Sequence, residues 1–591
     1  MNAPSRPPRT LDRSAPAPGP SAAAPGWSDR VLAFAAESHV RAAALLVALC
    51  LVCFLPGLAS LQPMDRDEPR FAQASKQMLE TGDLVDIRFQ GEARHKKPVG
   101  IYWLQAASVA AGEALGVPGA RTRIVLYRLP SLLGAVAAAL LAYWAALAVL
   151  ARRHALLAAA LFASCLMLAA EAHLAKTDAV LTACATAAFG ALARAWLGRE
   201  RAGEGPRAPL PAAPLPALTC LAFWLGLALG ILVKGPMVPM FVGLAALPLA
   251  LRARSGRWLL ALRPWPGLAL ALLIVAPWFL AIAWKSGGAF FGEAVGHDML
   301  GKVGGAKEKH WGPPGAYLLV FFATFWPGAA FAALSLPFAW RERGTDRVAL
   351  LLAWIVPAWI VFECVPTKLP HYVLPLMPAV AILTVLAAAR GALDPARRGA
   401  RAVAALVVLI PAGLTLALAY AGWQLDRTLP WAALPLLAAS ACVAGLAWLA
   451  FARGNPERAL ATAILAAALL TPGVLGLAQA ALPALKVSPR LAAIRDGLAC
   501  PDPRVASLGY REPSLVFLIG TDLATPNSGP EAVDFLNAGG CRLVFVEERF
   551  APDFKAAVGA AAPAPSVAGR VLGFNINGGR RVDLTAYAVI P

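Results

Sequence analysis

The residues best suited to chemistry lie together in the segment Met64–Trp103, which follows the first long apolar run of the chain. The segment opens with Asp67-Glu68-Pro69-Arg70 and reaches a second charged cluster at His95-Lys96-Lys97. Ionisable groups at the depth of a membrane are costly and usually functional. The simpler interpretation is that Asp67 only caps a short helix that ends near Gly82, a contribution of about 1 kcal/mol.

Further polar residues gather in other connections that we expect on the same side of the membrane. They are Glu171, His173, Lys176, Asp178, Lys234, His297, Asp298, Lys302, Lys307, Lys309, His310, Lys368, His371 and Tyr372. Taken singly, each is also explained by a helix cap or by a side chain that reaches the membrane interface. Taken together, they predict a cationic site with a few carboxylates, which suits a lipid phosphate.

The composition is that of a protein embedded in a membrane. Hydrophobic residues make up 59% of the 591 residues and charged residues 15%, against roughly 45–50% and 25% in soluble globular proteins. Apolar runs of about 20 residues recur between Arg41 and Leu482, and we count roughly thirteen that could cross a bilayer as helices. The predicted fold is therefore mainly α: a polytopic helical bundle with a small C-terminal α/β domain.

Arginine-rich connections alternate along this region and predict its orientation. They are the N-terminal tail, Arg152-Arg153 and the segments 194–207, 252–263, 341–347, 390–401 and 453–458. Because basic loops stay in the cytoplasm, we expect the N-terminus inside and both the segment 62–123 and the C-terminus outside. The formal charge of +19 then reflects topology and contacts with the lipid bilayer, so nucleic acid is not expected as a partner.

Changes in pattern predict three domains. Residues 1–38 are predicted to form a disordered cytoplasmic tail, residues 39–484 the membrane domain and residues 485–591 the outer α/β domain. In the last domain we expect strands at 505–508, 515–519, 543–547, 571–575 and 582–589, and helices at 489–498, 529–538 and 552–561. Asn577-Gly-Gly predicts a hairpin turn. Cys500 and Cys541 lie where oxidation is permitted, and a disulfide or two free thiols are both open alternatives.

The motifs of the charged segment resemble one family when they are taken in combination. They are Asp67-Glu-Pro-Arg-Phe-Ala, Met78-Leu-Glu-Thr-Gly-Asp, Lys96-Lys-Pro and Tyr102-Trp-Leu, and more weakly Lys176-Thr-Asp, Lys234-Gly-Pro and Lys368-Leu-Pro-His-Tyr. They are similar to the first outer loop of GT-C glycosyltransferases, the group that includes lipid A aminoarabinose transferases and protein O-mannosyltransferases.

The resemblance implies an inverting glycosyltransferase of the bacterial inner membrane. Such an enzyme moves a sugar from a polyprenyl-phosphate carrier to a periplasmic acceptor, here lipid A or another part of lipopolysaccharide. Asp67 matches the essential carboxylate, which would act as general base for a hydroxyl acceptor or as a positioning group if the acceptor is an ionised phosphate. The remaining site candidates are Arg70, Lys97 and Tyr372 as phosphate ligands by motif, Lys234 and Lys368 as phosphate ligands by position, and Glu68, Lys96, His95 and Asp178.

Two other functions remain open. A protein O-glycosyltransferase of the same fold would transfer the sugar to a protein acceptor. A transporter or flippase of lipid-linked sugars would also need many spans and a cationic outer pocket. The chain lacks the repeated halves and paired broken helices typical of such transporters, and its polar residues are expected on one side of the membrane.

One departure from the family pattern concerns a metal. Aminoarabinose-type relatives carry Phe-Glu-Lys-Pro where this chain has His95-Lys96-Lys97-Pro98, and that Glu resembles a metal ligand together with a His matching His297. A charged lysine has no lone pair to offer a divalent ion. We therefore expect no metal cofactor, the alternative being a site rebuilt from Asp67, His95 and His297. The departure also argues against assuming aminoarabinose as the sugar.

Overall fold

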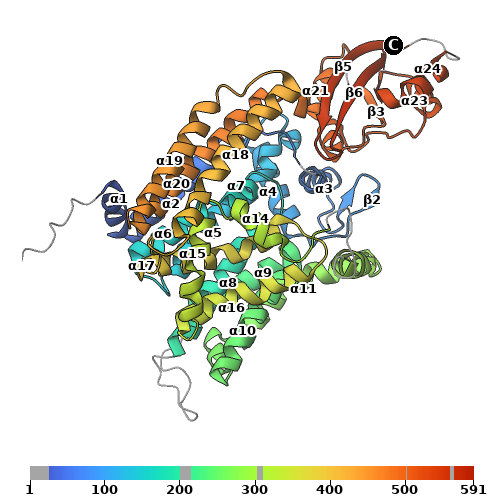
Figure 1. Ribbon diagram of the computed structural model, residues 1–591. Coiled ribbons are helices and arrows are strands. Elements are labelled where there is room, and N and C mark those ends of the chain that lie inside the picture. The colour runs from blue at the N-terminus through green and yellow to red at the C-terminus, as the bar shows by residue number, and fades with distance from the viewer. Residues whose placement is uncertain are drawn as a thin grey trace, which may run out of the picture.

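Helices form most of the computed structural model, which describes residues 26–64, 66–199, 215–301, 311–500, 502–559 and 565–590, the side chains of 298 and 299 excepted. A helical bundle carries a small sheet domain at its C-terminal end (Figure 1). The helices of the bundle are α1 (Trp27–Ala36), α2 (His39–Phe54), α3 (Asp67–Thr81), α4 (Gly100–Ala114), α5 (Ile124–Ala146), α6 (Arg152–Ala163), α7 (Leu166–Ala172), α8 (Asp178–Gly198), α9 (Ala217–Lys234), α10 (Met237–Ala253), α11 (Pro264–Lys285), α12 (Ala289–Phe291), α14 (Ala316–Thr324), α15 (Ala329–Arg341), α16 (Asp346–Cys364), α17 (Met377–Ala389), α18 (Ala400–Asp426), α19 (Leu434–Ala452) and α20 (Pro456–Thr471).

Many of these helices are long and apolar enough to cross a membrane. Within the described ranges there are nine, or ten if the bent pair of α6 and α7 is one span. The chain is thus a multi-pass membrane protein, and the prediction of a mainly helical polytopic bundle is confirmed. The predicted count of thirteen is not confirmed, because several apolar runs form short helices such as α2, α10 and α15 that fall below the length of a full span.

Burial distinguishes the centre of the bundle from its lipid-facing edge. In the apolar window of α8, 83% of the residues are buried, against 22% in α11 and 17% in α18. The 22 residues of α11 extend about 33 Å, close to the ~30 Å of a hydrocarbon core. Its exposed tryptophans, Trp265 and Trp284, lie near its two ends, where aromatic rings prefer the membrane interface.

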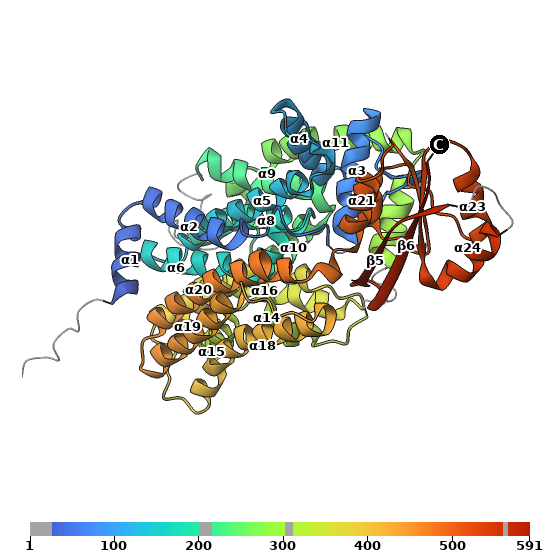
Figure 2. The same ribbon diagram turned by 90° about the horizontal axis from the view of Figure 1, so that it is seen from above.

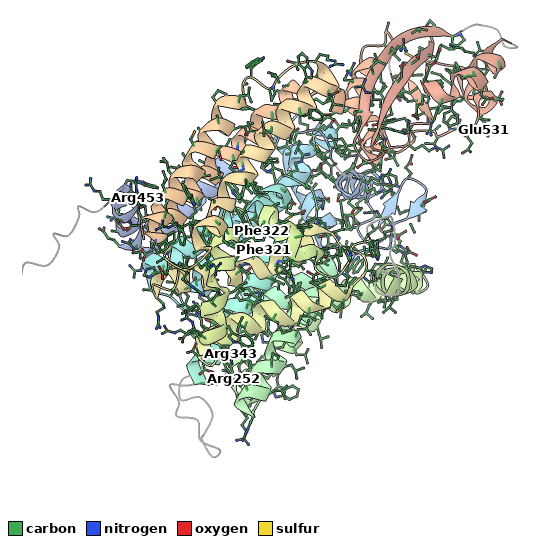
Figure 3. The ribbon with its side chains drawn as sticks, viewed as in Figure 1. Arg252, Phe321, Phe322, Arg343, Arg453 and Glu531 are labelled. Atoms are coloured by element: carbon green, nitrogen blue, oxygen red, sulfur yellow. A yellow bond between two sulfur atoms is a disulfide. The ribbon has the colours of Figure 1, made fainter. Side chains whose placement is uncertain are left out.

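Three arginines of the connections between helices lie away from the sheet domain. Arg252, Arg343 and Arg453 are found at the opposite end of the bundle from Glu531, which belongs to the sheet domain (Figure 3). Seen from above, the helices lie to one side and the sheet domain lies beyond α3 (Figure 2). One end of the bundle therefore carries these arginines and the other end carries the sheet domain.

The helix α1 corrects one prediction. The disordered tail was expected to reach residue 38, but α1 occupies Trp27–Ala36. Its Leu32 and Ala35 pack into the bundle core, and Asp29 pairs with Arg153 of α6 at 2.6 Å. Only ten residues long, this helix offers too short an apolar pattern to stand out from the tail. Residues 1–25 of the predicted tail lie outside the described residues.

The sheet domain contains four strands in the order β3-β4-β6-β5. They are β3 (Arg504–Leu508), β4 (Arg542–Glu547), β5 (Ser566–Asn575) and β6 (Arg580–Val589), and the helices beside them are α21 (Val487–Asp496), α22 (Pro513–Ile519), α23 (Gly529–Asn537) and α24 (Ala551–Val558). β3 and β4 are parallel, whereas β6 pairs antiparallel with β4 and β5. Four of the five predicted strands, the three predicted helices and the hairpin at Asn577 are thus confirmed.

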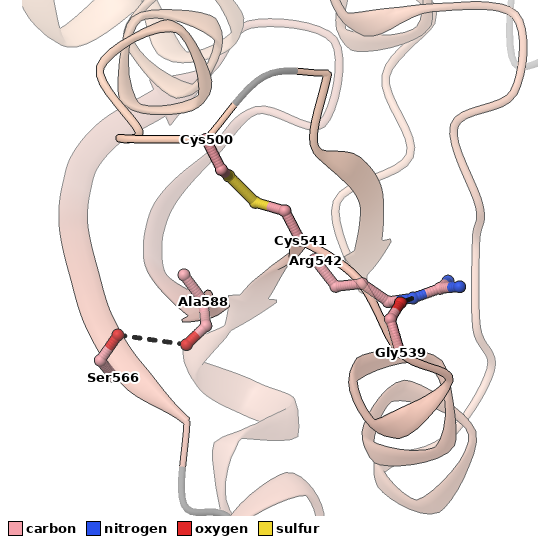
Figure 4. Close-up of a disulfide and its surroundings, with 6 residues drawn as sticks. All are labelled: Cys500, Gly539, Cys541, Arg542, Ser566 and Ala588. Atoms are coloured by element: carbon pink, nitrogen blue, oxygen red, sulfur yellow. Dashed lines mark hydrogen bonds between the residues drawn. A yellow bond between two sulfur atoms is a disulfide. The ribbon is translucent and has the colours of Figure 1, made fainter. Parts of the chain in front are cut away.

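The fifth strand prediction, at 515–519, is wrong. Those residues belong to the helix α22, which begins at Pro513 and buries Leu515 and Phe517. A five-residue apolar run fits a buried helix as well as a strand, and proline in the first helical turn favours the helix. The disulfide alternative for Cys500 and Cys541 is confirmed: the two residues are bonded, with their Cα atoms 6.4 Å apart (Figure 4).

The sheet domain contacts the bundle through α22 and the turn that follows it. The ring of Phe517 packs edge-on against Tyr127 of α5, with centroids 5.2 Å apart. The hydroxyl of Thr521 accepts a hydrogen bond from Gln73 and donates one to Glu80, both at 2.6 Å. Gln73 and Glu80 belong to α3, so this helix is held between the bundle and the sheet domain.

Candidate active site

The helix α3 places Asp67 at its N-terminus. Pro69 lies in the first turn, where its missing N–H costs no helical hydrogen bond, and Gly82 ends the helix in the left-handed conformation with φ of 73°. Arg66, and not Asp67, occupies the N-cap position, so the capping role considered for Asp67 does not apply. The Asp67 side chain is 49% exposed, which leaves its carboxylate accessible to a substrate.

Cations surround this carboxylate. The guanidinium of Arg94 lies 3.8 Å from Asp67. Partial burial raises the pKa of Asp67, but the charges of Arg94, Lys176, Arg70 and Lys97 outweigh this effect and hold the pKa below its usual value. Asp67 is therefore ionised at neutral pH, as a general base or an acceptor of hydrogen bonds requires. The structure brings Asp67, Arg70 and Lys97 together and adds Arg94, which the sequence analysis missed.

Glu68 has a structural partner of its own. Arg128 of α5 donates to its two carboxylate oxygens at 2.7 and 2.9 Å, and both side chains are completely buried. Arg128 also donates to the backbone carbonyls of Leu58, Leu61 and Gln62. This bidentate pair fixes the start of α3 to the bundle. Glu68 therefore anchors Asp67, and the structure does not support Glu68 as a group that touches substrate.

A second cluster of charges joins α8, α9 and the 3-10 segment η5 (Pro370–Leu376). The ammonium of Lys234 lies 2.5 Å from the carboxylate of Asp178 and 5.2 Å from the ring centroid of Tyr372. His371 lies 3.8 Å from the other oxygen of Asp178. Lys234 therefore joins two other predicted site residues, through an ion pair with Asp178 and a cation–π contact with Tyr372.

Lys176 connects the second cluster to Asp67. Its ammonium lies 3.4 Å from Glu171, which is 3.5 Å from His371, and its charge acts on Asp67. Glu171 and Lys176 are buried, so their interaction is weakly screened by water. The site thus contains both cations and carboxylates, and Glu171 and Asp178 offset part of the positive charge that the sequence predicted.

Lys368 has a different role from the predicted phosphate ligand. Its ammonium donates to the carbonyls of Phe362, Glu363 and Val365 at 3.1, 2.8 and 2.9 Å, at the end of α16. A lysine has three donors, and these three carbonyls use them. Lys368 therefore caps a helix C-terminus, a position where a cation also complements the helix dipole.

The residues considered for a metal do not come together. His95 is hydrogen-bonded to Asp86 at 2.7 Å, Lys96 is half-buried, and His297 is exposed on η4 (Gly292–Leu300). In the part of the chain that the structure describes, no group of three or more His, Cys, Asp or Glu side chains could hold a metal ion. Lys302, Lys307, Lys309, His310 and the side chain of Asp298 lie outside the described residues.

Comparisons with known proteins show what the whole chain is similar to. No protein-family model matches the chain. The undecaprenyl phosphate-alpha-4-amino-4-deoxy-L-arabinose arabinosyl transferase of Pseudomonas aeruginosa (strain LESB58) is 31% identical over 349 residues, which are 57% of this chain and 58% of that protein. The transferase of the same name from Pectobacterium carotovorum subsp. carotovorum (strain PC1) is 29% identical over 70% of this chain and 71% of its own length. The chain thus spans a little over half the length of the first of these relatives.

A solved structure extends the similarity to the whole fold. The crystal structure of ArnT from Cupriavidus metallidurans bound to undecaprenyl phosphate aligns with 92% of this chain and 97% of its own, with a TM-score of 0.67 and 20% sequence identity. At this identity the comparison establishes the fold. The predicted GT-C fold and the predicted resemblance to aminoarabinose transferases are therefore confirmed.

Proposed function

We propose that the chain is an inverting membrane glycosyltransferase that moves a sugar from a polyprenyl-phosphate carrier to lipid A or another part of lipopolysaccharide. The observation that carries this proposal is the ionised, accessible carboxylate of Asp67, held among cations at the start of α3. The fold of ArnT bound to undecaprenyl phosphate and the donor named for the relatives support the choice of a polyprenyl-phosphate sugar.

The geometry suits a single displacement at the anomeric carbon. The bond from this carbon to the carrier phosphate breaks while a bond to the acceptor oxygen forms on the opposite face. Negative charge grows on the leaving phosphate, where Arg70 and Lys97 would stabilise it. Asp67 would take the proton of a hydroxyl acceptor, whereas an ionised phosphate acceptor brings no proton and Asp67 would then hold a substrate in position. Tyr372 and Lys234 of the second cluster would be further phosphate contacts.

We also propose that α3 and the sheet domain face the periplasm of a bacterial inner membrane and that the N-terminus is cytoplasmic. Arg252, Arg343 and Arg453 at the other end of the bundle support this orientation, since basic loops stay inside (Figure 3). A reporter active only in the periplasm should work when fused after Pro591 and fail at Gly399. The reverse result at the C-terminus would place the sheet domain in the cytoplasm.

We further propose that turnover requires no divalent metal. Support comes from His95, which pairs with Asp86 instead of Asp67, and from Lys96, which stands where aminoarabinose-type relatives carry a Glu. The same departure is the reason to test sugars other than the aminoarabinose named for the relatives.

The proposed reaction can be tested with the purified full-length chain in lipid nanodiscs, given undecaprenyl-phosphate-linked sugars and lipid A. Transfer to lipid A would support the proposal, and transfer only to peptides would favour protein O-glycosylation. Donor movement across vesicle membranes without any transfer would favour a flippase.

Asp67→Asn tests the role of the carboxylate in the same assay. We expect it to lower turnover by well over tenfold, a loss of more than about 1.4 kcal/mol of transition-state stabilisation. Asp83→Asn is the matched control, because Asp83 lies in the same segment but follows the other end of α3. Its carboxylate pairs with Lys285 at 2.5 Å. Turnover of Asp67→Asn above a tenth of the parental value would contradict the assignment.

A further inference from the structure

A cavity of about 210 Å³ lies between the sheet domain and the start of α3. Four arginines line it: Arg66, Arg511, Arg549 and Arg580. Arg66 is the N-cap residue of α3 and directly precedes Asp67. The cavity is therefore adjacent to the candidate active site, although none of its arginines belongs to the clusters described above.

Two buried carboxylates organise these guanidinium groups. Glu547 is 3% exposed and pairs with both Arg580 and Arg549, the latter at 3.2 Å. Glu512, on the cavity wall, lies 3.7 Å from Arg66 and is 8% exposed. The side-chain amides of Asn575 and Asn577 also donate to Glu512, at 2.8 and 2.9 Å. Arg511 pairs with neither carboxylate and donates to the carbonyls of Thr525 and Pro526 and to the side-chain oxygen of Asn527. The four guanidinium groups that line the cavity therefore carry two more positive charges than Glu512 and Glu547 offset.

The excess charge is presented in a form that suits phosphate. A guanidinium has five N–H donors, and Arg580 uses its two terminal nitrogens to hold Glu547. One terminal nitrogen of Arg549 donates to the carbonyl of Gly509 at 3.0 Å and also faces Glu547. The Arg549 side chain is 54% exposed, so the other edge of its planar fork is accessible to an anion and can bind phosphate oxygens in pairs. The volume is below the roughly 300–1,000 Å³ of sites for drug-sized ligands. It therefore fits a single anionic group of a larger molecule.

We propose that this cavity binds a phosphate group of the acceptor and holds the acceptor against the start of α3. The proposal rests on the proposed function for the identity of the acceptor, whereas the binding of phosphate rests on the cavity alone. Arg66 links the two sites, because its side chain lines the cavity and its backbone begins the helix that carries Asp67. Phosphate in the cavity would thereby orient the acceptor beside the carboxylate.

The first test is the binding of inorganic phosphate to the purified full-length chain, measured by isothermal titration calorimetry. Lys97→Ala serves as the background, so that phosphate binding at the donor side is weakened. In this background Arg549→Gln should weaken binding by roughly tenfold or more. Arg570→Gln is the matched control: Arg570 is 58% exposed and pairs with Asp583 in the same sheet domain outside the cavity. Equal phosphate affinities in the two variants would overturn the proposal.

The second test separates phosphate of the acceptor from free phosphate, in the otherwise parental chain. With lipid A as acceptor in nanodiscs, Arg549→Gln should raise the KM for the acceptor by roughly tenfold and leave kcat within about twofold. Lipid A without its phosphates can accept the sugar only at a hydroxyl, and where it does, Arg549→Gln and the parent should have the same KM for it. An unchanged KM for lipid A, together with weakened binding of inorganic phosphate, would show a site for free phosphate and overturn the acceptor assignment. Absence of any transfer would reject the proposed function, and the calorimetry would still decide whether the cavity binds phosphate.

Discussion

Loss of the buried ion pair between Glu68 and Arg128 is predicted to destabilise the protein far more than loss of an exposed pair. Both side chains are 0% exposed, and Glu68 also accepts hydrogen bonds from the backbone of Met64 and Ala175 at 2.6 and 2.9 Å. Removing one partner of a buried pair leaves a buried charge without compensation and costs about 3–5 kcal/mol. In Glu68→Gln an NH₂ group replaces one carboxylate oxygen, and this NH₂ group would face N–H donors of Arg128 and of the backbone. We therefore expect a loss of about 3 kcal/mol or more.

The matched control is Glu113→Gln, which breaks the exposed pair with Arg121 at 2.6 Å. Exposed pairs contribute about 0–1 kcal/mol. Thermal unfolding of the two variants, followed by tryptophan fluorescence in one detergent, should show a Tm several degrees lower for Glu68→Gln and nearly parental for Glu113→Gln. At temperatures below the melting range, the turnover of Glu68→Gln should also be lower than that of the parent, because α3 loses its anchor to α5. Similar Tm values for the two variants would refute the view that this pair fixes the start of α3.

Three further predictions concern the candidate active site. Arg70→Ala and Lys97→Ala should each lower kcat/KM by roughly 10²–10³-fold, as the loss of a preorganised donor does. Lys368→Ala should mainly lower the Tm, because the ammonium of Lys368 bonds the end of α16. Equal and mild losses of kcat/KM at the three positions would point to diffuse attraction of lipid. Because surrounding cations lower the pKa of Asp67, its stabilising contribution is present above pH ~4 and is lost as the pH falls through the lowered value. Lys97→Ala removes one of these cations and should move the acid limb of the kcat/KM profile to higher pH, and an unmoved limb would contradict the electrostatic argument. Thorough EDTA treatment should leave turnover intact and metal analysis should find no stoichiometric ion, whereas activity lost to EDTA and restored by Zn²⁺, Mn²⁺ or Mg²⁺ would make Asp67 and His297 the ligands to test.

The parts of the site that are continuous in the chain could be predicted, and those that depend on packing could not. Asp67, Arg70 and Lys97 lie in one polar segment between apolar runs, so their motif is visible in the sequence. Arg128 is a single charge inside an apolar run, where average hydropathy conceals it, although a lone arginine at such a position is itself a signal. The role of Lys368 depends on where α16 ends, which the apolar pattern does not determine to within a turn.

The helices and strands likewise divide into those that the sequence pattern predicts and those that depend on packing. Long apolar runs predicted the helical bundle, and alternating patterns predicted β3, β4, β5 and β6. The run at 515–519 was too short to distinguish a helix from a strand. The predicted count of thirteen spans is not confirmed, and apolar composition does not reveal where a run bends, as between α6 and α7 at 61°.

The contact between α3 and the turn after α22 has a consequence for the synthesis of the protein. Gln73 and Thr521 bond to each other across 448 positions of the chain. At about 5–20 residues per second, ribosomes need roughly 20–90 s to make that stretch. For this time the helix that carries Asp67 exists without the domain that will cover its outer face. The geometry of the site is therefore completed last, and a nascent chain released before α22 would hold its transmembrane helices but not a braced α3.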